Sequence, residues 1–80
     1  MNLTKGEFSL FNLKTRIVLL NNNGKMLIKK QIDAMHEIQL FLMHDFYVEV
    51  FFDFHKKQIL KAEPVLSHNY LQIYFGSYEP

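Results

Sequence analysis

Two carboxylates, Glu49 and Asp53, lie in the most hydrophobic stretch of the chain, DFYVEVFFDF at residues 45–54. A pair of carboxylates can divide general acid and general base work, but the two groups then stand about 5–9.5 Å apart. On a strand that rises about 3.3 Å per residue, Glu49 and Asp53 are separated by about 13 Å. This spacing predicts two independent groups on the solvated face of a strand, with Asp53 opposite Lys61.

Histidines are the other candidate bases or metal ligands, and the chain has four: His36, His44, His55 and His68. Their spacing does not match the HxH, HxxxH or HExxH patterns of zinc sites. The sequence also contains no cysteine, no glycine-rich phosphate loop and no nucleophile elbow. We therefore predict no catalytic residue, no metal site and no cofactor, and we interpret the carboxylates and histidines as surface groups.

The composition is that of one small globular domain over residues 1–80. Hydrophobic residues make up 49% of the chain and charged residues 21%, which excludes a disordered or membrane-spanning protein. No apolar run approaches the roughly 18 residues that cross a bilayer, and the N-terminus lacks the pattern of a secretory signal. The absence of cysteine agrees with a cytoplasmic location. A formal net charge of +1 is too small for non-specific attraction to nucleic acid.

Strict alternation of side chains predicts two adjacent strands, at residues 36–43 and 46–54, joined by a turn at His44-Asp45. The first strand is expected to place Ile38, Leu40 and Leu42 on the face opposite Phe41 and Met43. The second strand is expected to bury Phe46, Val48, Val50, Phe52 and Phe54 together. Its solvent face is expected to carry Tyr47, Glu49, Phe51 and Asp53. A weaker edge strand, ILKAE, follows and ends at Pro64.

The segment IVLLNNNGKMLIKKQI predicts a β-hairpin, because Asn-Gly between two apolar runs is the strongest short-range hairpin signal. Asn23 and Gly24 would then adopt the positive φ of a type I′ turn. Residues 17–20 would pair with residues 25–32 across that turn.

The C-terminal segment SHNYLQIYFG has a helical period, with Tyr70, Leu71, Tyr74 and Phe75 in one stripe. Ser67 suits the N-cap and Gly76 the position after the helix, although a further strand is the alternative. The expected fold class is α+β: an antiparallel β-meander of four to five strands with a C-terminal helix packed on one face.

The same elements carry a resemblance. The stretch LFLMHDFYVEVFFDFHKKQILKAEPVLSHNYLQIYF resembles a set of short uncharacterised bacterial proteins. These have a Leu-Tyr-rich strand, a turn, a Phe-Tyr-Val-Glu-Val-aromatic strand, an Ile-rich strand and a terminal helix. The likeness covers about residues 36–75 and rests mainly on Phe46-Tyr47-Val48-Glu49-Val50. It implies a bacterial protein with the meander-plus-helix fold and implies no chemistry.

Four apolar residues are candidate partner contacts on the sheet face opposite the main core: Phe41, Met43, Tyr47 and Phe51. The partner would be a second copy in a homodimer, or a larger protein. Cover by the N-terminal segment, through Phe8, Leu10 and Phe11, is the alternative. A base-stacking surface is a third interpretation, but Glu37, Glu49 and Asp53 on this face would repel phosphate.

Size also favours association. A domain of 80 residues buries only about 60% of the surface of its unfolded chain, and this one has no disulfides to support it. The sequence therefore predicts a small non-catalytic binding or interaction module, in a homodimer or bound to a larger protein, with no membrane contact. A nucleic-acid-binding β-sheet module is the alternative, and a small enzyme ranks third.

Overall fold

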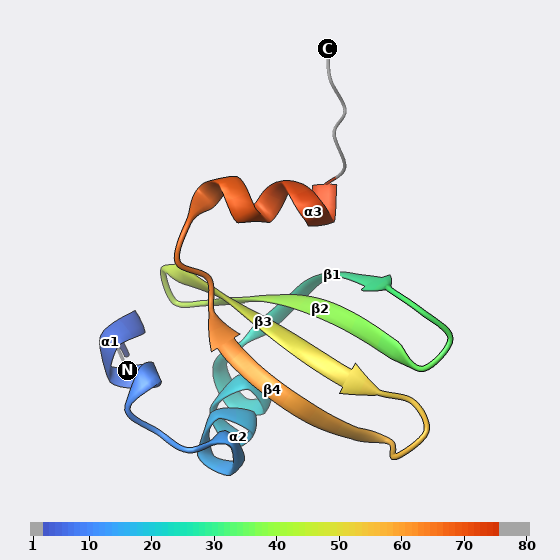
Figure 1. Cartoon of the computed structure of the whole chain (residues 1–80). Coiled ribbons are helices and arrows are strands. Elements are labelled where there is room, and N and C mark those ends of the chain that lie inside the picture. The colour runs from blue at the N-terminus through green and yellow to red at the C-terminus, as the bar shows by residue number, and fades with distance from the viewer. Residues whose placement is uncertain (1–2, 76–80) are drawn as a thin grey trace.

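The chain forms a four-stranded antiparallel sheet with helices against both of its faces, as a computed structural model shows (Figure 1). The structure describes residues 3–75. Two helices come first, α1 (Lys5–Ser9) and α2 (Leu13–Asn23). The strands follow as β1 (Lys25–Gln31), β2 (His36–Met43), β3 (Phe46–Asp53) and β4 (Gln58–Pro64). A 3-10 helix, η1 (His68–Leu71), then continues into α3 (Gln72–Phe75).

Each strand pairs with its neighbour along the chain, in the order β1-β2-β3-β4. The predicted α+β class, the antiparallel meander and the C-terminal helix are thus confirmed, as is the turn at His44-Asp45 between β2 and β3. The predicted N-cap is also present, because the side chain of Ser67 accepts a hydrogen bond from the Asn69 backbone N–H. The expected role of Gly76 falls outside the described residues. Within residues 3–75, no helix combines the length and apolarity needed to span a membrane.

The predicted hairpin at Asn23-Gly24 is wrong, because the residues before the glycine form helix α2. The Asn12 side chain caps that helix by accepting a hydrogen bond of 2.9 Å from the Thr15 backbone N–H. Gly24 ends it with a φ of −90°, an ordinary extended conformation and not the positive φ of a type I′ turn. Glycine is needed there for another reason: a Cβ would lie only 2.8 Å from the carbonyl oxygen of Leu20.

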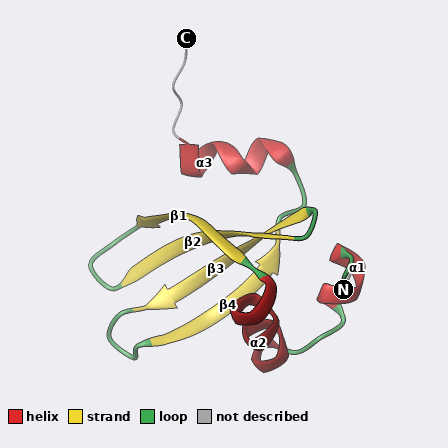
Figure 2. Ribbon diagram, turned by 180° about the vertical axis from the view of Figure 1, so that it is seen from behind, coloured by secondary structure: helices red, strands yellow, loops and turns green. Residues whose placement is uncertain are grey.

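The first hydrophobic core lies between the N-terminal helices and one face of the sheet (Figure 2). Its centre is Phe8 of α1, which is fully buried and meets the Phe46 ring edge-on at a centroid distance of 5.8 Å. Leu10 and Phe11, which in the alternative of cover by the N-terminal segment would join Phe8 on the sheet, are exposed. The buried members of this core are Phe8, Leu20, Met43, Phe46, Val48, Val50 and Ala62.

The second core lies on the opposite face, beneath η1 and α3, and its buried members are Ile38, Leu40, Leu71 and Tyr74. The middle strands β2 and β3 therefore contribute side chains to both cores. Burial of Phe46, Val48 and Val50 follows the prediction, but Phe52 is only half-buried. Phe54 is 37% exposed because it lies beyond the end of β3, in the turn that leads to β4.

Candidate functional site

The four predicted partner contacts do not share a face of the sheet. Phe41 lies opposite Val48 and Met43 opposite Phe46, so both belong to the face covered by α1 and α2. The two-residue turn between β2 and β3 fixes this register, and a shift of one residue exchanges the faces. The other two residues, Tyr47 and Phe51, pack against the second core under α3.

The predicted pairing of Asp53 with Lys61 is also wrong. Asp53 lies opposite Gln58 instead, and a bulge shifts the register of β3 and β4 between Phe51 and Phe52. Lys61 lies opposite Phe51, and its Nζ stands 4.8 Å from the centre of that ring. The lysine charge is therefore placed over an aromatic face, where the ring quadrupole attracts a cation.

Glu49 and Asp53 were predicted to reach water, but both are buried, with exposed fractions of only 6% and 7%. The hydroxyl of Tyr70 lies 2.7 Å from Oε1 and 2.8 Å from Oε2 of Glu49, so its single proton is shared between the two carboxylate oxygens. The hydroxyl of Tyr74 donates to Oε2 at 2.6 Å. Tyr70 and Tyr74 are about one helical turn apart, so their side chains leave the C-terminal segment on the same side. Such short O–H···O contacts are typical of hydrogen bonds to an ionised carboxylate.

Among the side chains that the structure describes, no basic one forms an ion pair with Glu49. Lys61, on the same face, is stacked on the Phe51 ring. Arg16 reaches the edge of β4 and pairs with Glu63 at 3.4 Å. Tyrosine hydroxyls therefore provide the polar contacts of the buried carboxylate, as hydrogen-bond donors that carry no charge.

Both tyrosines are harder to ionise than a free tyrosine. Burial, followed by the hydrogen bond to Glu49, raises the pKa of Tyr70 to about 12. The same two causes raise the pKa of the more deeply buried Tyr74 further still. Since an unfolded chain has a tyrosine pKa of about 10, the stabilisation from Tyr70 is complete below pH 10 and is lost as the pH rises towards 12.

We expect Glu49→Gln to shift the titration of Tyr70 from about 12 back towards 10, because the amide removes the negative charge that opposes tyrosinate formation. An alkaline titration followed by tyrosinate absorbance measures this, and Tyr70→Phe assigns the component. Glu63→Gln, which removes an exposed carboxylate opposite Glu49 on β4, is the control. An identical titration curve for Glu49→Gln and the wild type would contradict the contact.

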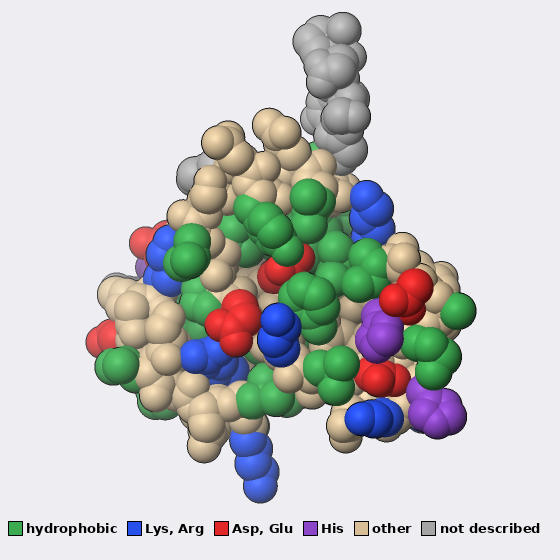
Figure 3. Space-filling view, viewed as in Figure 1, with side chains coloured by type: hydrophobic (Ala, Val, Ile, Leu, Met, Phe, Trp, Pro, Cys, Tyr) green, Lys and Arg blue, Asp and Glu red, His purple; other side chains and the backbone are tan. Residues whose placement is uncertain are grey.

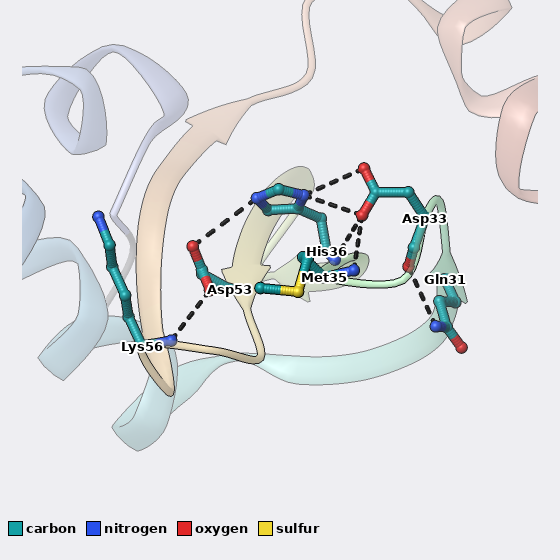
Figure 4. A network of polar contacts seen from close by, with 6 residues as sticks. All are labelled: Gln31, Asp33, Met35, His36, Asp53 and Lys56. Carbon is teal, nitrogen blue, oxygen red and sulfur yellow. Dashed lines mark hydrogen bonds and ion pairs between the residues drawn. The ribbon is translucent and has the colours of Figure 1, made fainter.

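At the other end of the same sheet face, His36 bridges two carboxylates (Figure 4). Its Nδ1 lies 3.0 Å from Asp33 Oδ1, and its Nε2 lies 3.7 Å from Asp53 Oδ2. A backbone hydrogen bond from Met35 and then the His36 side chain lower the pKa of Asp33. The backbone N–H of Lys56, which donates to Asp53 at 3.0 Å, is the main cause that lowers the pKa of Asp53.

This network joins two loops and has no catalytic constellation. Nucleophilic catalysis needs a hydroxyl or thiol beside a free imidazole nitrogen, whereas each nitrogen of His36 faces a carboxylate. Among the described residues, no group of three or more acidic or histidine side chains is arranged to hold a metal ion. The backbone N–H of Phe54 donates to the Met35 carbonyl at 2.8 Å, which adds a second link between the loops. His44 and His55 lie exposed in turns, as predicted.

A shallow cavity of about 280 Å³ opens beside Glu49, at the connection between β4 and η1. Its lining residues are Glu49, Pro64, Val65, Leu66, Ser67 and Tyr70. In the view of Figure 3, acidic side chains lie among hydrophobic ones on this side of the sheet. Sequence reasoning missed this site because its members lie 21 residues apart in the chain, as Glu49 and Tyr70 do. The available signal was an acid in an apolar strand, together with two tyrosines spaced by four residues.

The comparisons with known proteins leave function to be argued from this geometry: no family model, no curated protein and no solved structure matches the chain.

Proposed function

We propose that the protein is a small non-catalytic interaction module that binds an extended acidic segment of another protein along the free edge of β1. The carrying observation is that β1 is accessible along one edge. Only Ile28 of its seven residues is half-buried, and the other six are exposed. Within residues 3–75, the backbone of β1 is hydrogen-bonded to β2 and to no other element. A row of unpaired N–H and C=O groups is a template for a further strand.

The opposite edge of the sheet is partly occupied by side chains from the N-terminal helices. The guanidinium of Arg16 donates to the Ala62 carbonyl of β4 at 2.7 Å, and the Lys5 ammonium donates to the Val65 carbonyl at 3.4 Å. These cations come from the two N-terminal helices, which also contact β4. The asymmetry between the edges favours β1 as the site of contact.

Charge favours an acidic partner over a second copy of this chain. β1 carries Lys25, Lys29 and Lys30 and no acidic residue, and it has exposed apolar side chains at Met26 and Leu27. Two β1 strands side by side would bring six lysines together, and like charges on neighbouring strands repel. A partner strand that alternates acidic and apolar residues would complement both the lysines and the exposed apolar side chains of β1.

The test uses a blocked hexapeptide of alternating Glu and Val, with a Lys-Val peptide as its charge control. We expect the acidic peptide, at low salt, to slow amide hydrogen exchange in β1 and to leave β4 unchanged, since it adds hydrogen bonds to the free edge only. Added salt should weaken the effect. The Lys-Val peptide should bind at least about tenfold more weakly.

Two double variants localise the contact. Lys25→Glu with Lys29→Glu reverses the charge of β1 and should abolish binding of the acidic peptide. Lys14→Glu with Lys57→Glu makes the same change in net charge on α2 and on the β3–β4 turn, and should leave binding within about twofold of the wild type. Lys30 is left in place because its ammonium donates to the Ile73 carbonyl of α3 at 2.8 Å. Equal loss in both variants, self-association in light scattering, or salt-sensitive oligonucleotide binding in place of peptide binding would each overturn the proposal.

A further inference from the structure

Glu49 combines two properties that are rarely found together without a ligand. The residue is only 6% exposed, and among the side chains that the structure describes no basic one pairs with it. Burying an ion without a counter-ion costs several kcal/mol, so such a group is normally paired or bound to a cation. Tyrosine hydroxyls supply three contacts to it, from Tyr70 and Tyr74. The two hydroxyls carry only two protons, so a carboxylate with about four acceptor sites keeps free acceptor capacity, and Oε1, which Tyr74 does not contact, is the less occupied oxygen.

The cavity beside Glu49 has the chemistry that complements an organic cation. Its walls at Pro64, Val65 and Leu66 are apolar, and Leu66 is 84% exposed at the rim. Tyr70 is 41% exposed and lines the same space. An aromatic face and a carboxylate together attract an ammonium group, and the aliphatic wall accommodates its alkyl chain. Anions are disfavoured, because Glu63 lies opposite Glu49 on the neighbouring strand.

We propose that this cavity is a binding site for a small alkylammonium ion, whose N–H groups bond Glu49 while its charge rests against the Tyr70 ring. At about 280 Å³ the cavity is at the small end of ligand sites, so it admits a short alkyl chain and not a large ligand. The site is separate from the free edge of β1, which lies two strands away from β3 in the sheet.

The experiment titrates the full chain with n-butylammonium chloride at neutral pH, where the amine is protonated. Backbone amide chemical shifts report the response at each residue. We expect saturable shifts that centre on Val65, Ser67 and Tyr70. The neutral isostere n-butanol should bind at least about tenfold more weakly, and butyrate should produce no saturable shift at these residues.

Substitutions at Glu49 and Tyr70 test whether the carboxylate charge and the aromatic ring each contribute to binding. Glu49→Gln should weaken n-butylammonium binding at least about tenfold, while Glu63→Gln, the control carboxylate on the adjacent strand, should change it less than about twofold. Tyr70→Phe keeps the ring and should retain binding, whereas Tyr70→Ala should weaken it. If Glu49→Gln does not fold, this tyrosine pair decides the question in a chain that keeps the carboxylate. Equal binding of the amine and the alcohol, shifts confined to other carboxylates such as Asp33 or Asp45, or equal affinity in Tyr70→Phe and Tyr70→Ala would overturn the proposal.

Discussion

Phe8→Ala is expected to lower the free energy of unfolding by about 3–5 kcal/mol. Phe8 is the one buried side chain of α1, a five-residue helix that depends on a capping box between Thr4 and Glu7. Its ring contacts Phe46 edge-on, and the Arg16 guanidinium lies 5.4 Å from the ring centre. Removing the ring therefore leaves a cavity and also loses an aromatic pair and a cation–π contact.

Urea unfolding of the variant and the wild type measures the effect. Phe11→Ala is the matched control, because Phe11 lies three residues further along and is 39% exposed. Phe11→Ala should lower the free energy of unfolding by at least about 1 kcal/mol less than Phe8→Ala does. Equal losses in the two variants would show that α1 is not docked on the sheet through Phe8.

The second large effect is expected in Leu40→Ala, which should lower stability by about 2–5 kcal/mol. Leu40 is fully buried in the second core, directly opposite Glu49 on β3. Because β2 and β3 supply both cores, the variant should still unfold in a single transition that fluorescence and circular dichroism report together. A single transition would show that the two hydrophobic cores unfold together as one cooperative unit.

Leu66→Ala is the control for this prediction, since it removes the same side chain from a position that is 84% exposed. Its effect should stay within about 0.5 kcal/mol. A Leu40→Ala chain as stable as the wild type would mean that η1 and α3 do not form a core with β2. Separate transitions for the two probes would contradict the shared role of the middle strands.

The alternation of side chains was sufficient to predict the meander from residue 36 onwards. Period two is unambiguous in β2 and β3, and the polar dipeptide His44-Asp45 marks their turn. Alternation defines the two faces of each strand separately, however, and the predicted grouping of Phe41 and Met43 with Tyr47 and Phe51 on one face is wrong. The pairing of Met43 with Phe46 sets the relative phase of the two strands, and it depends on turn geometry that periodicity does not contain.

The hairpin prediction for the segment before Gly24 is wrong for a different reason. Its β-branched residues and the Asn-Gly pair favour a hairpin locally, but tertiary packing decided for a helix. Leu13 and Leu20, seven residues apart, lie on one side of α2 and pack into the first core. Burial of Glu49 could not be predicted from its own strand either. It depends on the hydroxyl groups of Tyr70 and Tyr74, which belong to η1 and α3 and follow β4 in the sequence.

The position of Glu49 in the middle of β3 also matters before the protein has folded. In a newly made or denatured chain, the run from Phe46 to Phe52 reads FYVEVFF, which has high β-propensity and contains neither proline nor glycine. Such a segment pairs readily with copies of itself, and a single charge in its centre opposes that pairing. We therefore expect the carboxylate that the tyrosines later enclose to oppose aggregation of this segment during synthesis, before the C-terminal residues that cover it have been made.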